Sequence, residues 1–344
     1  MIKALWLALA VFMQGQPVAA QNRLRVATYN LGLGRDGPGV LLKDILEQKP
    51  DVMALAGIIS RNAPDVILLT GFDNDYQNLA LRQFNALAGL QFPFIFAPLG
   101  NEGSDSGLDI NGNGRLRDWN DAWGFGRFEG SKGMALLSRY PIGKSRVFNR
   151  LLWQDFGPNP QAPDAAPYYP AALWSQLRLA AHSLWDVEIL APSLPFHILA
   201  AHPTPPVFDG PENANGLRNA AEISFLNRYL SGEAFQDDSG QFAPLAEVPV
   251  VVLADLNAAL DQGSSLKPAL RGLLAHPRLH PMRAHPTVDW DSTGKMQVDY
   301  VLPDHALTVL DTGVFWPEAS PLLEAAKTRH RLIWVDIGPP EGRG

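Results

Sequence analysis

The chain has 344 residues and no cysteine, and its 28 Lys and Arg against 35 Asp and Glu give a formal net charge of −7. The lack of cysteine excludes disulfides, thiolate zinc sites and a cysteine nucleophile. The acidic balance argues against tight nonspecific DNA binding, because proteins that hold nucleic acid by neutralising phosphates are usually basic. It does not exclude an enzyme that meets a phosphoester in one local pocket.

Residues 1–20 have the layout of a cleavable secretory signal. Lys3 precedes an apolar run from Ala4 to Met13, and small residues lead to a predicted cleavage site near Ala20. The run is too short for a resident membrane helix, and no transmembrane segment is expected later in the chain. The alternative is a hydrophobic N-terminus with no targeting role. The pattern predicts an exported protein, periplasmic or secreted, with residues 21–344 as a single domain.

Strand-like and helix-like runs alternate along the rest of the chain. We expect strands at 24–29, 65–70, 133–138, 173–180, 196–202, 248–255, 298–303 and 332–337. We expect helices at 40–48, 53–60, 76–88 and 213–230. This interleaving predicts a mixed α/β domain with layered packing. Two segments rich in glycine and proline, 98–131 and 154–170, are expected to be long surface loops, a frequent location of function.

Polar side chains recur at the ends of five of these strands. They are Asn30, His202, the pair Asp255 and Asn257, Asp299, and His330. If the chain stays extended through residue 257, Asp255 and Asn257 face the same side, because side chains two apart on a strand do so. A single Asp or Asn at a strand end often only starts a turn. A matching set over five segments favours one shared site.

These groups suit the hydrolysis of a phosphodiester. The reaction requires a water molecule in line with the leaving oxygen and stabilisation of charge on the phosphoryl oxygens. A carboxylate orients the water, amides and imidazoles donate to phosphate oxygens, and a divalent cation neutralises them. The expected substrate is therefore a phosphoester, whether in nucleic acid, a lipid headgroup or a small molecule.

The ordered motifs resemble the endonuclease/exonuclease/phosphatase superfamily, with its DNase I-like fold, and are most similar to its exported bacterial members. The resemblance runs over nearly all of residues 21–344, through TYN, PDVILLTGFD, GMALLSRYPI, AHPTPP, LADLNA, VDYVLP and RHRLIWVDI. It implies a four-layer α/β/β/α sandwich with the site at one end of two packed sheets. It also implies a metal-dependent phosphodiesterase, nuclease-like in its chemistry.

The resemblance assigns catalytic roles to four positions. Asp255 matches the aspartate that handles the attacking water, and His202 matches the histidine that contacts the scissile phosphate. Asp299 matches the carboxylate that orients the last histidine of the site, which is His330 here.

Phosphate and metal binding are implied at other positions. Asn257 matches an asparagine that holds a phosphate oxygen, and Asn30 matches the metal-proximal asparagine, which also faces the phosphate. The family usually has a metal-binding glutamate where this chain has Gly71. Asp73 or Asp75, in the following loop, are candidate replacements. Loss of a carboxylate is expected to weaken Mg²⁺ or Mn²⁺ binding, because Mg²⁺ sites typically depend on one or two carboxylates.

A second departure is Arg329, which stands where the family usually has an aspartate before the last histidine. An arginine there offers a fixed positive charge and a fork for phosphate oxygens. Two hypotheses follow. The protein is either a phosphodiesterase with altered site electrostatics, which we favour, or a non-catalytic binding protein that keeps the fold after losing the glutamate.

The loop at 107–124 predicts a separate, structural Ca²⁺ site. Its Asp109, Asn111 and Asn113 alternate before Gly114, as in the first half of an EF-hand loop. The twelfth-position glutamate is missing, although Asp121 stands nearby. The alternative is a plain polar loop, because Asn, Asp and Gly are also ordinary turn residues.

Overall fold

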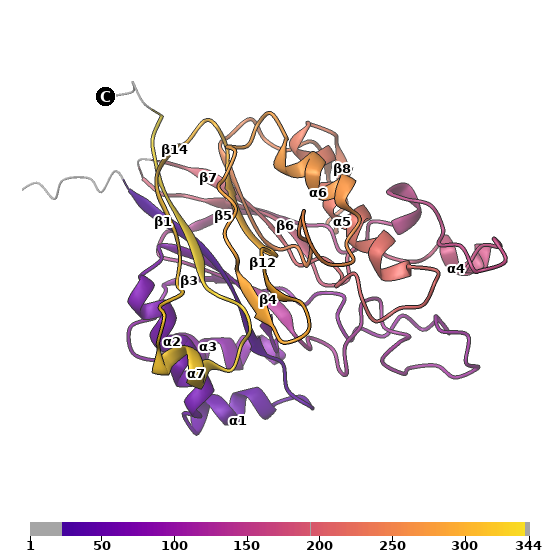
Figure 1. Cartoon of the computed structure of the whole chain (residues 1–344), viewed down its shortest axis with the longest axis horizontal. Helices are drawn as coiled ribbons and strands as arrows, with labels where there is room; N and C mark the ends of the chain where they lie inside the picture. The colour runs from indigo at the N-terminus through magenta and orange to yellow at the C-terminus, as the bar shows by residue number, and fades with distance from the viewer. Residues whose placement is uncertain (1–22, 193, 341–344) are drawn as a thin grey trace, which may run out of the picture.

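The computed structural model describes residues 23–192 and 194–340, so the predicted signal and its cleavage site lie outside the described residues. Two β-sheets pack face to face, and helices cover their outer surfaces (Figure 1). Within the described residues, no helix has both the length and the apolar character needed to cross a membrane.

The first sheet has six strands, in the order β14-β15-β1-β2-β4-β3. Their bounds are β1 (Leu24–Leu33), β2 (Val66–Phe72), β3 (Phe94–Phe96), β4 (Gly133–Ser138), β14 (Thr308–Val314) and β15 (Ile333–Gly338). β1 and β2 run parallel, and the other neighbours are antiparallel. Its outer face is covered by α1 (Val40–Leu46), α2 (Pro50–Asn62), α3 (Leu79–Asn85) and α7 (Pro321–Ala326) (Figure 1).

The second sheet has five strands, in the order β13-β10-β7-β6-β5. Their bounds are β5 (Ile142–Val147), β6 (Leu184–Ile189), β7 (Phe196–Ala201), β10 (Val250–Asp255) and β13 (Asp299–Pro303). α5 (Ala214–Leu230) and α6 (Lys267–Leu274) pack on its outer face. The smaller elements are η1 (Tyr76–Asn78), η2 (Trp153–Asp155), α4 (Ala171–Trp174), β8 (Phe235–Gln236), β9 (Phe242–Ala243), β11 (Val288–Trp290) and β12 (Gly294–Met296).

Three apolar cores fill the three spaces between these four layers. On β10, for example, Val251 and Leu253 belong to the core between the sheets, whereas Val250 and Val252 face α5 and α6. Strands buried on both faces read as continuous apolar runs, which is why VVVL carries no polar alternation. The predicted α/β/β/α sandwich is confirmed.

The strand predicted at 173–180 is wrong. Its first residues form α4, and the strand of this region is β6, which begins at Leu184. The carbonyls of 178–180 accept hydrogen bonds from side chains, namely the Arg218 guanidinium and the Asn101 amide, instead of pairing with a strand. An apolar run can therefore be buried here without a sheet partner, because buried carbonyls need a donor and not a particular element.

The sequence analysis missed β5 and β14, which lie at the edges of the two sheets. Both are partly exposed and carry polar residues, as in IGKSRV and TVLDTGV, so neither has the apolar run used to identify the central strands. The segments at 98–131 and 154–170 contain no strand and no helix beyond the end of η2, as expected for long loops.

The inter-sheet core yields a stability prediction. Leu253 has no exposed surface, and Leu253→Ala is expected to lower the free energy of unfolding by about 2–5 kcal/mol through lost burial and the cavity left behind. Leu310, half-exposed on β14, is the matched control. Leu310→Ala is expected to change the free energy of unfolding by less than about 1 kcal/mol. Urea denaturation measures the free energy of unfolding of both variants. Equal losses of stability would contradict the placement of Leu253 in the core between the sheets.

Candidate active site

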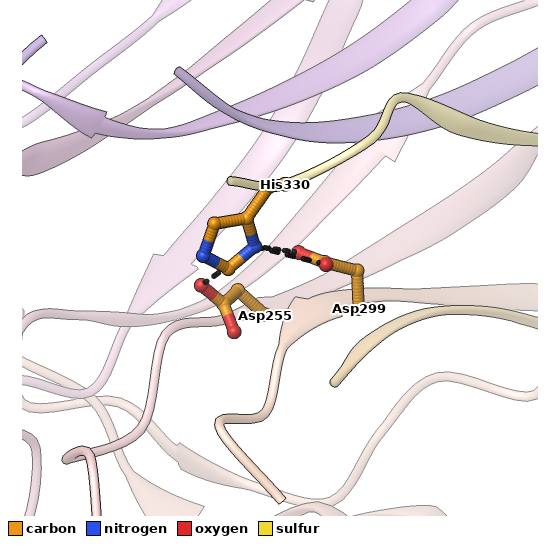
Figure 2. Close-up of side chains that lie close together, drawn as sticks. All are labelled: Asp255, Asp299 and His330. Carbon is orange, nitrogen blue, oxygen red and sulfur yellow. Dashed lines mark hydrogen bonds and ion pairs between the residues drawn. The ribbon is translucent and has the colours of Figure 1, made fainter. Parts of the chain in front are cut away.

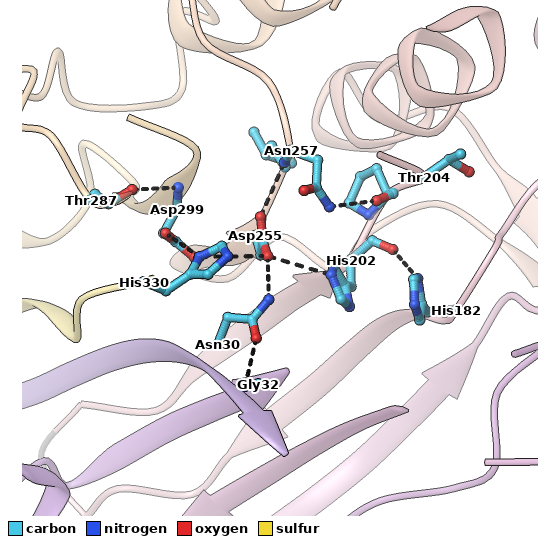
Figure 3. A network of polar contacts seen from close by, with 12 residues as sticks. Asn30, Gly32, His182, His202, Thr204, Asp255, Asn257, Thr287, Asp299 and His330 are labelled. Atoms are coloured by element: carbon cyan, nitrogen blue, oxygen red, sulfur yellow. Dashed lines mark hydrogen bonds and ion pairs between the residues drawn. The ribbon is translucent and has the colours of Figure 1, made fainter. Parts of the chain in front are cut away.

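Strand direction brings the polar strand ends to one rim of the sandwich. β7 and β10 are parallel, so His202, which follows β7, and Asp255 lie at the same edge. β13 is antiparallel to β10, and its first residue, Asp299, pairs directly with Asp255. β15 is antiparallel to β1, which places His330, just before β15, near Asn30. Figure 3 shows these side chains, predicted from separate segments, gathered in one cluster.

Asp255 is the centre of the cluster and has no exposed surface. Its Oδ2 accepts a hydrogen bond from Asn30 Nδ2 at 2.7 Å and lies 3.4 Å from His202 Nε2 and 3.9 Å from His330 Nδ1. Burial opposes ionisation of this carboxyl, but His330, His202 and Asn30 outweigh it and hold its pKa well below the usual range. Asp255 is therefore an anion across the physiological pH range.

His330 and Asp299 form a buried pair. The imidazole Nδ1 lies 3.0 and 3.2 Å from the two oxygens of Asp299, and Figure 2 shows the ring between the carboxylates of Asp299 and Asp255. Burial disfavours the imidazolium, yet Asp299 and Asp255 raise the pKa of His330 to about 9. Burial raises the pKa of Asp299 despite the opposing attraction of His330. The site thus contains a protonated histidine at neutral pH.

His182 is a site residue that the sequence analysis did not identify. Its ring stacks on that of His202 at a centroid distance of 4.0 Å, and its Nδ1 donates to the His202 carbonyl at 2.8 Å. Burial, with a smaller effect from His202, lowers the pKa of His182 far below its usual value, so the ring is neutral. His182 precedes β6 by two residues, and no motif marks it. Its contact with His202 arises only because β6 and β7 are paired.

Helix α5 holds the backbone on both sides of the cluster. Asn219 Nδ2 donates to the carbonyls of Thr204 and Leu256 at 2.8 Å each, joining the segments that follow β7 and β10. The buried Glu222 carboxylate accepts from the backbone N–H groups of Ala181 and Thr204. These two side chains fix the loops that carry both histidines and Asp255.

The extended geometry expected through Asn257 is not observed. β10 ends at Asp255, and Asn257 has a left-handed backbone with φ of 50°. Its backbone N–H donates to Asp255 Oδ1 at 3.1 Å, and its Nδ2 donates to the Pro203 carbonyl at 3.0 Å. The bond from the Asn257 N–H to the Asp255 side chain is of the Asx type and ends the strand at Asp255. The two side chains are therefore close because of this turn, and not because they alternate along a strand.

Gly71 lies against Asn30. A register shift between β1 and β2 occurs here, and Gly71 adopts φ of 64°. A Cβ at this position would collide with Asn30 Oδ1 and would lie 3.2 Å from the Gly32 nitrogen. Asn30 Oδ1 accepts from that nitrogen at 3.0 Å, which fixes the amide so that Nδ2 points to Asp255. The space that a side chain at 71 would enter is thus taken by the Asn30 amide.

The cluster has the donor chemistry of a divalent metal site. Ligand atoms of Asp255, Asp299 and His330 all lie within 4.8 Å of one another. Asn30 presents its Nδ2 to Asp255, while its oxygen accepts from the Gly32 nitrogen, so its predicted metal role stays a prediction. Carboxylate and amide oxygens suit Mg²⁺ and Mn²⁺, and imidazole suits transition metals. Because metal ligands must be deprotonated, binding through His330 would release its proton. The residues present fit a metal of this kind.

Two further predicted residues make other contacts. The Asp73 carboxylate accepts from the backbone N–H groups of Arg35 and Lys132, at 2.7 and 2.8 Å, and so fixes two loops. Arg329 donates to Asp291 and is about half-exposed. The metal role of Asp73 and the phosphate role of Arg329 stay predictions.

The predicted calcium loop is tied together by its own polar side chains. Asp109 accepts from the backbone of Asn113 and Gly114, and Asp121 accepts from Ile110. The Asn111 and Asn113 amides both donate to Asp118. This arrangement suits a polar loop with or without an ion, so calcium binding at Asp109, Asn111, Asn113 and Asp121 stays a prediction.

Residues 27–321 match the model of the Endonuclease/Exonuclease/phosphatase family, and the chain belongs to this family. Its members are metal-dependent phosphoesterases and nucleases. No curated protein sequence matches the chain.

Solved structures share the fold at low sequence identity. An endonuclease/exonuclease/phosphatase from Beutenbergia cavernae aligns with a TM-score of 0.57 at 19% identity, over 92% of this chain and 72% of that one. A humanised D. rerio TDP2 aligns at 0.51 and 12%, over 92% and 99%. The human Nocturnin catalytic domain aligns at 0.50 and 14%, over 92% and 94%. At these identities the likeness shows the fold alone.

The protonated His330 predicts a pH-dependent stability. Its pKa is about 9 in the folded state, against an ordinary value of 6.5. The folded state binds this proton more tightly, so the stabilisation is fully present below about pH 6.5 and is lost as pH rises through about 9. Urea denaturation in EDTA should show a fall of up to about 3 kcal/mol across this window. His330→Gln is expected to flatten this fall, and an unchanged profile in the variant would contradict the assignment.

Gly71→Ala is expected to lower the free energy of unfolding by at least about 1 kcal/mol, because the positive φ is strained for alanine and the Cβ displaces Asn30. Gly272, in α6, is the control because a Cβ there meets nothing within 4 Å. Gly272→Ala should instead raise the free energy of unfolding by about 0.5–1 kcal/mol. Urea denaturation compares the two, and similar effects would rule out the proposed conflict at position 71.

Proposed function

We propose that this protein is an exported, metal-dependent phosphodiesterase that hydrolyses its substrate by in-line attack of water. The observation that carries the proposal is the convergence of Asn30, His202 and His330 on one buried carboxylate, that of Asp255. A compact set of two carboxylates, one imidazolium and further amide and imidazole donors suits a phosphoryl transition state, in which negative charge spreads over the oxygens.

Asp255 orients the attacking water and accepts a hydrogen bond from it. Its depressed pKa makes it a weak base, so positioning of the water is its main contribution. His330, held by Asp299, provides a positive charge toward the phosphoryl oxygens. A leaving oxygen also requires a proton donor, and the His330 imidazolium is one.

Three side chains, those of His202, Asn257 and Asn30, bind the phosphate in this proposal. His202 faces the site with its Nε2, which lies 3.4 Å from Asp255 Oδ2, and its ring is fixed by stacking on His182. Asn257 uses one amide hydrogen for the Pro203 carbonyl and has a second for a phosphate oxygen. Asn30 lies between the two sheets with its amide aligned by Gly32.

The metal, Mg²⁺ or Mn²⁺, would be held by the carboxylates of Asp255 and Asp299. The metal role of Asn30 stays a prediction, because its Nδ2, and not its Oδ1, faces Asp255. When bound, the metal neutralises charge on the phosphoryl oxygens and lowers the pKa of a coordinated water. His330 is not a ligand in this arrangement and keeps its contact with Asp299.

Export and substrate class complete the proposal. The layout of residues 1–20 supports secretion with cleavage near Ala20. The substrate is a phosphodiester of nucleic acid, of a lipid headgroup or of a small molecule, and the acidic net charge of −7 disfavours tight nonspecific DNA binding. Selectivity resides in the loops around the rim and not in the shared fold.

Hydrolysis of bis-p-nitrophenyl phosphate with Mg²⁺, Mn²⁺ or Ca²⁺ tests the activity. Asp255→Asn keeps the shape of the side chain but removes the anion, and it is expected to lower kcat by about 10²–10⁴-fold. Glu247→Gln is the matched control, because Glu247 is exposed just before β10, at the opposite end of the strand from Asp255. It should leave kcat unchanged.

The opposite outcome identifies a binding protein. If the wild-type chain and Asp255→Asn are equally inert with every metal and with a range of phosphodiesters, the protein keeps the fold without turnover. Phosphate or metal binding that depends on Asp255 would then define its function.

A further inference from the structure

A pocket of about 490 Å³ lies beside the proposed active site and shares no residue with it. One wall is Asp36, from the segment that follows β1, and the other walls come from the loop between β3 and β4, from Gly103 to Arg127. Pockets for small organic groups usually have volumes of about 300–1,000 Å³. The pocket is therefore large enough for one substituent of a substrate bound at the site.

Both walls of the pocket are joined to segments that carry site residues. Asp36 follows Asn30 in the stretch of chain that leaves β1. On the other side, the Asn101 N–H donates to the His182 carbonyl at 2.9 Å, and His182 stacks on His202. The pocket thus borders the segments that carry two of the proposed phosphate ligands.

Trp119 is the large apolar side chain of the pocket and is 48% exposed. The Arg127 guanidinium lies over its ring, 5.2 Å from the ring centroid, and also donates to Asp36. A guanidinium held in this way fixes the indole through a cation–π contact. The exposed part of the indole offers a flat surface on which another flat group can stack.

Hydrogen bonds hold the backbone on both sides of Trp119. The Asp118 N–H donates to the Asp121 carboxylate at 3.4 Å, and the Asn120 N–H donates to the Asp118 carboxylate at 2.8 Å. Asp121 itself has no exposed surface. Because the indole is already held in place, little further conformational entropy is lost when a group stacks on it.

The charged side chains of the pocket already have partners. Arg127 contacts Asp36, and Arg117 lies 3.1 Å from Asp105. The remaining acid, Asp118, accepts hydrogen bonds from two amides of its own loop. Three carboxylates against two guanidiniums disfavour a second anionic group, and a lining with so many charges disfavours an acyl chain. An uncharged flat group with polar edges suits the pocket best.

We propose that the pocket binds a flat aromatic or heteroaromatic group, which the phosphodiester substrate carries on one of its ester oxygens, by stacking on Trp119. The inference rests on the proposed phosphodiesterase function and narrows its substrate class. A nucleobase and an aryl ester are the two sources of such a group, because both offer a π-face. A diester with aliphatic substituents lacks this face and is expected to bind more weakly.

Isothermal titration calorimetry of the full chain in EDTA measures the Kd of three methyl phosphodiesters. They are thymidine 5′-methyl phosphate, phenyl methyl phosphate and cyclohexyl methyl phosphate, whose cyclohexyl ring is apolar but not flat. EDTA stops metal-dependent turnover, so that binding is measured without hydrolysis. We expect one or both flat esters to bind about tenfold more tightly than the cyclohexyl ester.

Trp119→Ala removes the stacking surface at an exposed position. It is expected to weaken binding of the preferred flat ester by about tenfold and to leave the cyclohexyl ester unchanged. Trp119→Phe keeps a smaller ring and should retain part of the preference. Phe125→Ala is the matched control, because Phe125 is 60% exposed in the same loop but lies outside the pocket lining, and all three Kd values should stay unchanged.

The pattern of affinities identifies the source of the flat group. A preference for the thymidine ester alone would indicate a nucleobase, and a preference that includes the phenyl ester would indicate an aryl group. Equal affinities for the flat and cyclohexyl esters would overturn the proposal, as would a preference that Trp119→Ala leaves intact.

Hydrolysis of bis-p-nitrophenyl phosphate separates this inference from the proposed function. A chain that hydrolyses this diester but shows no preference for flat esters would contradict only the role of the pocket. A chain that binds flat esters through Trp119 and hydrolyses no diester would contradict the phosphodiesterase activity instead.

Discussion

The buried charge of Asp255 is the constraint on which the rest of the site depends. An anion removed from water is stable only when neighbouring charges and donors compensate it. Here the compensation comes from both sheets, because Asn30 on β1 reaches across the sandwich while His202 and His330 approach from the ends of two other segments. The same contacts that make the anion tolerable also hold the groups with which a phosphate would interact.

The alternation of side chains along β10 and β1 explains why the polar cluster lies at the end of the core between the two sheets. Along β10, Val251 and Leu253 face the core between the sheets, and Asp255 is the next residue on that face. Val26 on β1 leads in steps of two to Asn30 on the same face. The site is therefore the polar end of the inter-sheet core, where apolar packing stops at the rim. Its base is a close-packed interior, which gives the polar groups little freedom to move.

Several residues around the rim hold the site residues in place without being part of the proposed chemistry. His182 stacks on His202, Asn219 joins the two segments that follow β7 and β10, and Gly71 makes room for the Asn30 amide. Each of these residues positions another group and makes no contact with the substrate in the proposed reaction. At Gly71 the absence of a side chain is a structural requirement of this chain, because the positive φ and the adjacent amide exclude a Cβ.

The sequence by itself determined most central strands, a layered α/β fold and the identity of the polar residues at the strand ends, because apolar runs and their polar termini are local patterns. It misplaced the central strand β6, and the number of layers followed from the family resemblance. It did not determine the edge strands β5 and β14, whose partly exposed polar residues lack such a pattern. It also gave the wrong reason for the closeness of Asp255 and Asn257, which a left-handed turn produces. Only the tertiary structure decided the contacts of His182 with His202 and of Asn219 with the carbonyls of Thr204 and Leu256, because they join segments distant in the chain and depend on which strands become neighbours.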